Sequence, residues 1–118
     1  MSSRLKAGFW ISAYRQTVEQ AGGHLTIARH GDDDSGHIFI TLTASDRSSA
    51  LLSAMTGFDG ARRWRVVKSF SFAVNEINLI IEREIKRDPD CWVVDVDSKN
   101  GDHFLIEPIE GCLREDQI

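Results

Sequence analysis

Near the start of the chain, apolar residues recur at the spacing of a helix, mostly three or four positions apart. The residues on this apolar face are Ala7, Trp10, Ile11, Tyr14, Val18 and Ala21. Polar side chains occupy the opposite side, Ser2 or Ser3 can cap the start, and Gly22 and Gly23 can end the helix. The pattern predicts a first helix that packs its apolar face on a sheet.

Two apolar runs then flank a polar loop at residues 31–36. If His30 pairs with His37, Ile27 faces Ile40 and Leu25 faces Leu42 on one face, while Ala28 meets Phe39 on the other. The two runs therefore predict a hairpin. Residues 45–49 form a second turn before a strand at residues 50–55.

The middle of the chain predicts one more strand and a second helix. Residues 63–68 form a strand in which Trp64 and Val66 share a face, after a Gly-containing loop at residues 56–61. Within residues 72–87 an apolar stripe follows steps of three and four, which predicts a helix. Pro89 stops this helix, because the residue before a proline is disfavoured in the helical region.

Two strands are expected at the end. Residues 92–97 alternate as a half-buried strand does, and an Asn-Gly pair follows. A two-residue turn would set Asp97 opposite Phe104. A three-residue loop instead pairs Val96 with Phe104 and leaves Gly101 left-handed, so we favour it.

These elements have the order α-β-β-β-β-α-β-β. They predict an α+β fold with two helices packed on a mostly antiparallel sheet. The 118 residues are 42% apolar and 27% charged, which indicates one soluble globular domain. We expect that domain to span residues 1–110, with a flexible polar tail at residues 111–118. No apolar run is long enough to predict a membrane segment.

Charge and cysteine content narrow the function classes. Fourteen Lys and Arg against eighteen Asp and Glu give a net charge of −4, so a nucleic-acid partner is not favoured. Neither Cys91 nor Cys112 stands at metal-ligand spacing from another ligand, and two reduced thiols fit a cytoplasmic protein.

A basic strand is the best candidate for a functional surface. Arg63, Arg65 and Lys68 surround Trp64, and the two arginines point to the same side of the strand. They can contact an acidic partner or phosphate. An exposed aromatic residue for stacking on nucleic-acid bases is missing if Trp64 is buried.

An acidic loop is the second candidate. Its three carboxylates start at Asp32, and the EF-hand template fails because Gly36 and His37 occupy its fifth and sixth positions. A weak cation site formed by Asp32, Asp34 and His37 remains open beside the reading of an ordinary solvated turn. The favoured register of the last two strands would also set Asp97 beside His103, most simply as a surface ion pair.

Several segments together resemble a known family. They are RHGDDDSG from Arg29, FDGARRWRVVK from Phe58, DPDCWVVDVD from Asp88 and GDHFL from Gly101. In these segments the chain resembles a family of small alphaproteobacterial proteins classed as a domain of unknown function. The resemblance implies a single cytosolic bacterial domain and brings no catalytic residues. Cys91 departs from the aliphatic residue expected before the tryptophan.

The sequence therefore predicts a non-enzymatic cytoplasmic binding or regulatory module that acts through a partner protein, without a cofactor. The alternative is a small metal-assisted enzyme that uses the acidic loop of residues 32–34 with His30 or His37. A homodimer formed through a free edge strand is compatible with either.

Overall fold

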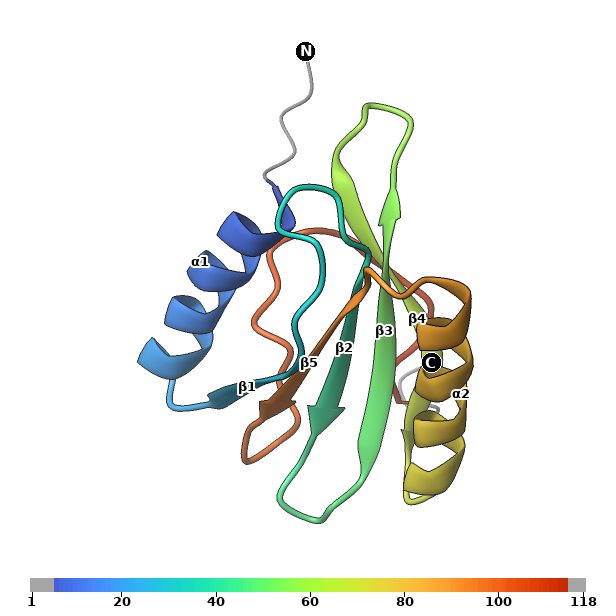
Figure 1. Ribbon diagram of the computed structural model, residues 1–118. Helices are drawn as coiled ribbons and strands as arrows, with labels where there is room; N and C mark the ends of the chain where they lie inside the picture. Colours follow the sequence, from blue (N-terminus) through green and yellow to red (C-terminus); the bar gives the residue numbers. More distant parts are fainter. Residues whose placement is uncertain (1–5, 115–118) are drawn as a thin grey trace.

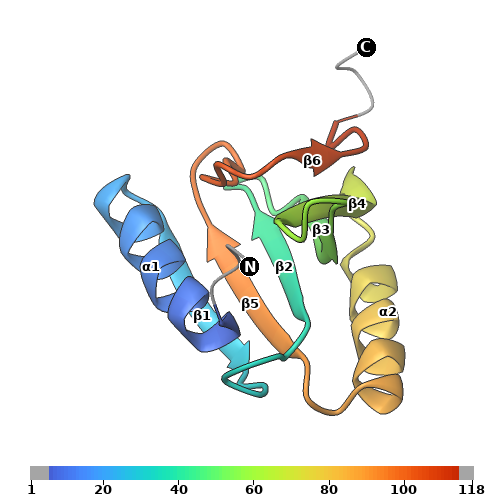
Figure 2. The same cartoon turned by 90° about the horizontal axis from the view of Figure 1, so that it is seen from above.

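Within residues 6–114, which this computed structural model describes, a six-stranded mixed sheet is the middle layer and one helix covers each face (Figures 1 and 2). The elements are α1 (Ala7–Gln20), β1 (His24–Arg29), β2 (Ile38–Thr43), β3 (Ser49–Thr56), β4 (Arg62–Ser71), α2 (Val74–Arg87), β5 (Trp92–Asp97) and β6 (Ile109–Glu110). The predicted α+β class and the order of helices and strands are confirmed.

The strand order is β1-β5-β2-β3-β4-β6, and it corrects the predicted hairpin. β5 lies between β1 and β2, antiparallel to the first and parallel to the second. Val94 therefore faces Ile27 on one side and Ile40 on the other. The apolar pattern could not exclude this arrangement, because β5 presents the same alternation as either neighbour. The loop between β1 and β2 is long enough to cross two strand spacings, about 10 Å.

The predicted pairing of residues 102–106 with β5 is also wrong. Both edges of β5 are occupied by β1 and β2, so no hydrogen-bonding edge remains for a further strand. The chain instead continues to β6, which pairs with β4 in parallel. Asp97 consequently faces His24 and Thr43 rather than His103, although Gly101 is left-handed as predicted, with φ 76°.

Helix α1 ends where the glycines predict. Gly22 has φ 94°, its amide donates to the Glu19 carbonyl, and the Gly23 amide donates to the Val18 carbonyl at 2.9 Å. This is the Schellman arrangement that satisfies the last carbonyls of a helix. At the other end Lys6 is the N-cap and gives no side-chain hydrogen bond. Ser2 and Ser3 lie outside the described residues.

The sheet has a core on each side. Among residues 6–114, the larger core joins α1 to one face through fifteen buried residues, including Trp10, Tyr14, Trp64 and Trp92. The smaller core joins α2 to the other face through Phe39, Leu51, Ile77, Cys91 and Val93. β2 and β5 contribute to both cores, which explains why they are apolar on both faces.

The segment after β5 crosses the α1 side of the sheet as a strap. Tyr14 donates its hydroxyl to the His103 carbonyl at 2.6 Å. Trp10 Nε1 donates to Glu107 Oε2 at 2.9 Å, and Trp64 Nε1 to Glu107 Oε1 at 3.3 Å. Further on, residues 111–114 lie against β4, where the amide of Phe70 donates to the carbonyl of Leu113 at 2.7 Å. Residues 115–118 of the predicted tail lie outside the described residues.

In the part of the chain that the structure describes, no helix has the length and apolar character needed to cross a membrane. Cys91 is buried, Cys112 is exposed, and no disulfide joins the two.

Candidate functional site

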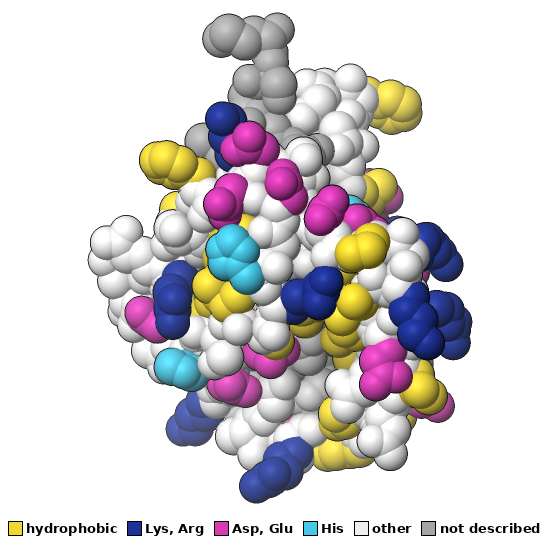
Figure 3. Space-filling model, viewed as in Figure 1, with side chains coloured by type: hydrophobic (Ala, Val, Ile, Leu, Met, Phe, Trp, Pro, Cys, Tyr) yellow, Lys and Arg dark blue, Asp and Glu magenta, His cyan; other side chains and the backbone are white. Residues whose placement is uncertain are grey.

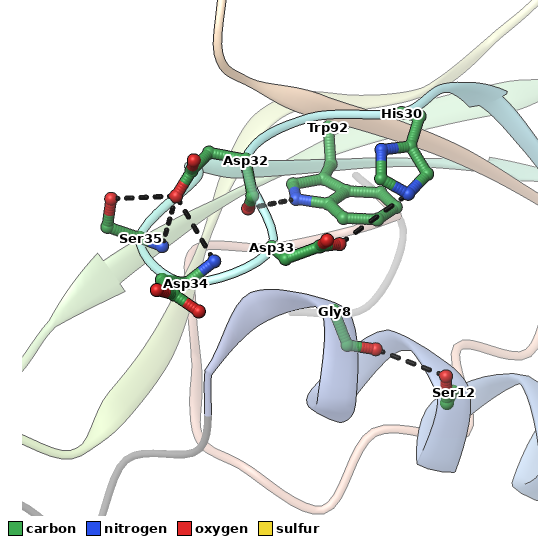
Figure 4. A network of polar contacts seen from close by, with 8 residues as sticks. All are labelled: Gly8, Ser12, His30, Asp32, Asp33, Asp34, Ser35 and Trp92. Atoms are coloured by element: carbon green, nitrogen blue, oxygen red, sulfur yellow. Dashed lines mark hydrogen bonds and ion pairs between the residues drawn. The ribbon is translucent and has the colours of Figure 1, made fainter.

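The acidic loop between β1 and β2 is a folded turn over the start of β5 (Figure 4). Asp32 Oδ2 accepts hydrogen bonds from the Ser35 amide at 2.9 Å, the Ser35 hydroxyl at 3.1 Å and the Asp34 amide at 3.1 Å. These bonds, the one from the Ser35 amide most of all, lower the pKa of the Asp32 carboxyl. The Asp32 carbonyl in turn accepts from Trp92 Nε1 at 2.8 Å, which fixes the loop to β5.

The same loop caps helix α1. The carbonyl of Asp33 accepts from the Gly8 amide at 2.9 Å, and that of Asp34 from the Ala7 amide at 3.5 Å. The Asp33 carboxylate lies 3.5 Å from His30 Nε2, and the Asp34 carboxylate 3.6 Å from the Lys6 ammonium. The acidic residues thus stand at the positive end of the helix dipole, where negative charge is stabilising.

The structure does not bring the predicted cation site together. Asp32 holds the turn and Asp34 lies beside α1, whereas His37 Nε2 is 2.8 Å from Ser53 Oγ on β3. Among residues 6–114, no group of three or more His, Cys, Asp and Glu side chains is arranged to hold a metal ion. The geometry therefore gives the acidic loop a structural role.

Of the three residues predicted on the basic strand, two lie on an open surface and the third is paired with a helix. Trp64 is fully buried, so Arg63 and Arg65 project from the other face of β4, with Arg65 exposed and Arg63 half-buried. Neither arginine has an ion-pair or hydrogen-bond partner among the described residues. Lys68 differs, because its ammonium is 2.7 Å from Glu76 Oε2 on α2 and is tied to the helix.

Arg65 lines a groove of about 370 Å³ between the sheet and the C-terminal half of α2. The sheet side of this groove contains His37, Ser53, Met55 and Arg65. The helix side contains Ile80, Glu84, Arg87 and the following Asp88. Dark-blue basic side chains gather over this half of α2, while the acidic ones gather over the loop between β1 and β2 (Figure 3).

Two further hollows extend the groove toward the tip of the β3–β4 hairpin, which projects beyond the rest of the sheet (Figure 1). One has about 320 Å³ and shares His37 and Met55 with the groove; the other has about 340 Å³ and contains Phe58 and Arg63. Met55 lines all three hollows, and Phe58 at the tip is fully exposed. We call these three hollows together the binding track.

Ser53 is not among the predicted site residues, and His37 is predicted in the acidic loop rather than beside Arg65. The sequence links His37 to the acidic loop and Arg65 to the basic strand, far apart along the chain. The pairing of β3 with both β2 and β4 brings them together, since Ser53 lies opposite Phe39 on one side and Arg65 on the other. The predicted strand at residues 50–55 is the feature of the sequence that could have pointed to Ser53, because the register of this strand decides which residue stands beside Arg65.

Comparison with known proteins gives a family and a fold. The family model described as "Protein of unknown function (DUF1491)" matches residues 5–106. A crystal structure of a DUF1491 family protein from Caulobacter crescentus CB15 is 32% identical, covers 90% of this chain and 99% of its own, and has a TM-score of 0.82. An NMR structure of a DUF1491 family protein from that organism is 31% identical, covers 91% and 97%, and has a TM-score of 0.80.

A solution structure of a protein from A. tumefaciens shows the same fold at 24% identity, with a TM-score of 0.77 and coverage of 92% of this chain and 99% of that one. The comparison with curated proteins gives no match.

Proposed function

Because this chain belongs to the DUF1491 family of proteins of unknown function, we propose a function for it from its own geometry: it is a binding module that takes an extended acidic segment of a partner protein along the binding track. The resemblance to small alphaproteobacterial proteins is thereby confirmed. The proposed role is non-enzymatic and cytoplasmic, as the sequence predicts.

One observation carries the proposal. Arg63 and Arg65 lie two positions apart on one face of β4, and neither has an ion-pair partner among the residues that the structure describes. A guanidinium binds a carboxylate through two parallel hydrogen bonds, which gives both affinity and orientation. Two such groups along one strand suit a segment whose carboxylates repeat at extended spacing.

The rest of the track supports an extended ligand. The three hollows adjoin one another along β3 and β4, so a chain lying in them would pass both arginines. Met55 contributes to every hollow, and an unbranched thioether side chain adapts to ligands of different shape. At the far end, Phe58 offers a fully exposed ring that a partner can bury.

The test is an NMR titration of the protein with a short, unphosphorylated glutamate-rich peptide. We expect the amide signals of Ser53, Arg63 and Arg65 to move, and the affinity to fall as salt is added. Reversing both charges with Arg63→Glu and Arg65→Glu should weaken binding at least ~10-fold.

The matched control reverses two exposed charges on the outer side of α2, Arg83→Glu and Lys86→Glu, which changes the net charge by the same amount. Binding should survive in this control. If both double variants lose the peptide equally, the attraction is general rather than local, and the proposed site is wrong.

A further inference from the structure

We propose that the groove at the α2 end of the track is a pocket for a phosphoryl group, so that the partner segment is recognised when one of its side chains is phosphorylated. This inference rests on the proposed function and specifies its ligand. It is carried by three side chains that the sheet register brings to one place, His37, Ser53 and Arg65.

The three side chains form a row across neighbouring strands. Ser53 and Arg65 are direct cross-strand partners, and the Cβ atoms of such partners lie about 5 Å apart. His37 stands two residues before Phe39, the partner of Ser53 on the other side, and its Nε2 reaches Ser53 Oγ at 2.8 Å. A hydroxyl, an imidazole and a guanidinium therefore line the same groove.

This set of groups suits a phosphoryl group better than a single carboxylate. A phosphoryl group has three strongly accepting terminal oxygens and a charge of about −1.5 to −2 at neutral pH. When the imidazole carries its proton on Nε2, it donates to Ser53 Oγ and leaves the hydroxyl hydrogen for the ligand. Without a ligand, the Ser53 hydroxyl donates to the Ala54 carbonyl at an O···O distance of 3.4 Å. This is long for a hydrogen bond from a hydroxyl, so an oxygen of the ligand can readily replace the carbonyl as the acceptor.

Two carboxylates also line the groove, and both are engaged with other groups. Glu84 Oε1 is 3.4 Å from Arg87 Nη1 on the same helix. Asp88 Oδ1 accepts from the Asp90 amide at 3.2 Å. Both belong to the α2 side, which also holds Arg87, so the opposite side presents His37, Ser53 and Arg65 to the ligand. The groove of about 370 Å³ also has room for the side chain that carries the phosphate.

The test compares three peptides of one glutamate-rich sequence that carry serine, glutamate or phosphoserine at the central position. We expect the phosphoserine peptide to bind about tenfold more tightly than the glutamate peptide. Ser53→Ala and Arg65→Lys should remove this preference, the second because lysine keeps the charge but lacks the planar fork. Arg63→Gln should weaken all three peptides alike. Arg65 is exposed, so its variant tests the pocket without disturbing the core.

Each outcome decides a different point. Equal affinity for the glutamate and phosphoserine peptides overturns the phosphoryl pocket and leaves the proposed function standing. Absence of binding by all three overturns both. If inorganic phosphate or free phosphoserine binds as tightly as the phosphoserine peptide, the pocket serves a small molecule, and the inference of a phosphorylated partner segment is wrong.

Discussion

The carbonyl oxygen of Asp33 accepts a hydrogen bond from the amide of Gly8 at 2.9 Å, so the loop between β1 and β2 caps a helix that precedes both strands in the chain. Lys6 offers no side-chain cap, and a helix start without one leaves amide donors to be satisfied from elsewhere. The acidic loop supplies both the carbonyls and negative charge. A run of three aspartates is thereby explained without a metal ion.

Removing one of these charges should destabilise the protein slightly. For Asp33→Asn we expect the free energy of unfolding to fall by about 0.3–1 kcal/mol, because the carboxylate no longer favours the helix dipole. Urea denaturation at low salt measures the loss, which should shrink in high salt. Glu82→Gln, an equal charge change on the exposed side of α2, is the control and should cost less. An equal loss of stability in both variants would contradict the capping role. So would an Asp33→Asn variant as stable as the unmodified protein at both low and high salt.

Close packing of the loop on β5 makes a second residue sensitive. A Cβ added at Gly36 would lie 2.7 Å from the carbonyl oxygens of both Asp32 and Asp90, and backbone atoms cannot move aside easily. We expect Gly36→Ala to lower the free energy of unfolding by about 1–3 kcal/mol, read as a lower Tm. Gly60→Asn is the control, since its side chain meets open space and Asn tolerates positive φ. A Tm for Gly36→Ala as high as that of the control would show that the loop can move away.

Local patterns in the sequence predict the helices and most of the strands, but not how the strands pair. The periodicity of α1 and α2 and the alternation in β4 and β5 depend on local burial, which a sequence displays directly. Strand pairing depends on which alternating run lies beside which. The runs that become β1, β2 and β5 have apolar patterns that allow any two of them to pair. One signal was available: apolar residues on both faces of β2 and β5 are typical of central, covered strands.

The candidate site was predictable only in part for the same reason. Arg63 and Arg65 stand out because cations on the exposed face of a strand are visible from alternation alone. Ser53 reaches the site only because β3 pairs in a particular register with both β2 and β4. His37 reaches it only because the loop between β1 and β2 ends just before β2. Lys68 could not be separated from the arginines, because its partner Glu76 belongs to a helix whose position on the sheet the sequence leaves open.

Glu107 should hold the strap to the rest of the protein. Its two carboxylate oxygens accept from Trp10 and Trp64, one on α1 and one on β4. In Glu107→Gln one acceptor becomes a donor that faces an indole N–H, so we expect a loss of about 1–3 kcal/mol. The indole N–H signals of Trp10 and Trp64 should move in an NMR spectrum. That of Trp92, which donates to the Asp32 carbonyl, should stay and serves as an internal control. Movement of all three would indicate a general change of fold instead.

Tyr14 should make the protein unfold at alkaline pH. Burial first, and the charge of Glu107 second, raise the pKa of its phenol well above the ordinary value of 10.0. Below pH 10 the phenol is protonated in both states. Above it, the unfolded chain loses the proton while the folded one keeps it, so the free energy of unfolding falls by up to ~1.4 kcal/mol per pH unit.

The chain has a single tyrosine, so the phenolate absorbance reports this residue alone. We expect that absorbance to appear together with unfolding, rather than at the ordinary pKa in the folded protein. Tyr14→Phe should remove this part of the pH dependence while costing about 1 kcal/mol at neutral pH, because the hydrogen bond to the His103 carbonyl is lost. The Cys91 thiol, whose pKa burial also raises, acts in the same direction, so part of the alkaline slope should remain in that variant. A phenolate that forms near pH 10 with the helix signal intact would show that the strap opens without unfolding and leaves Tyr14 exposed.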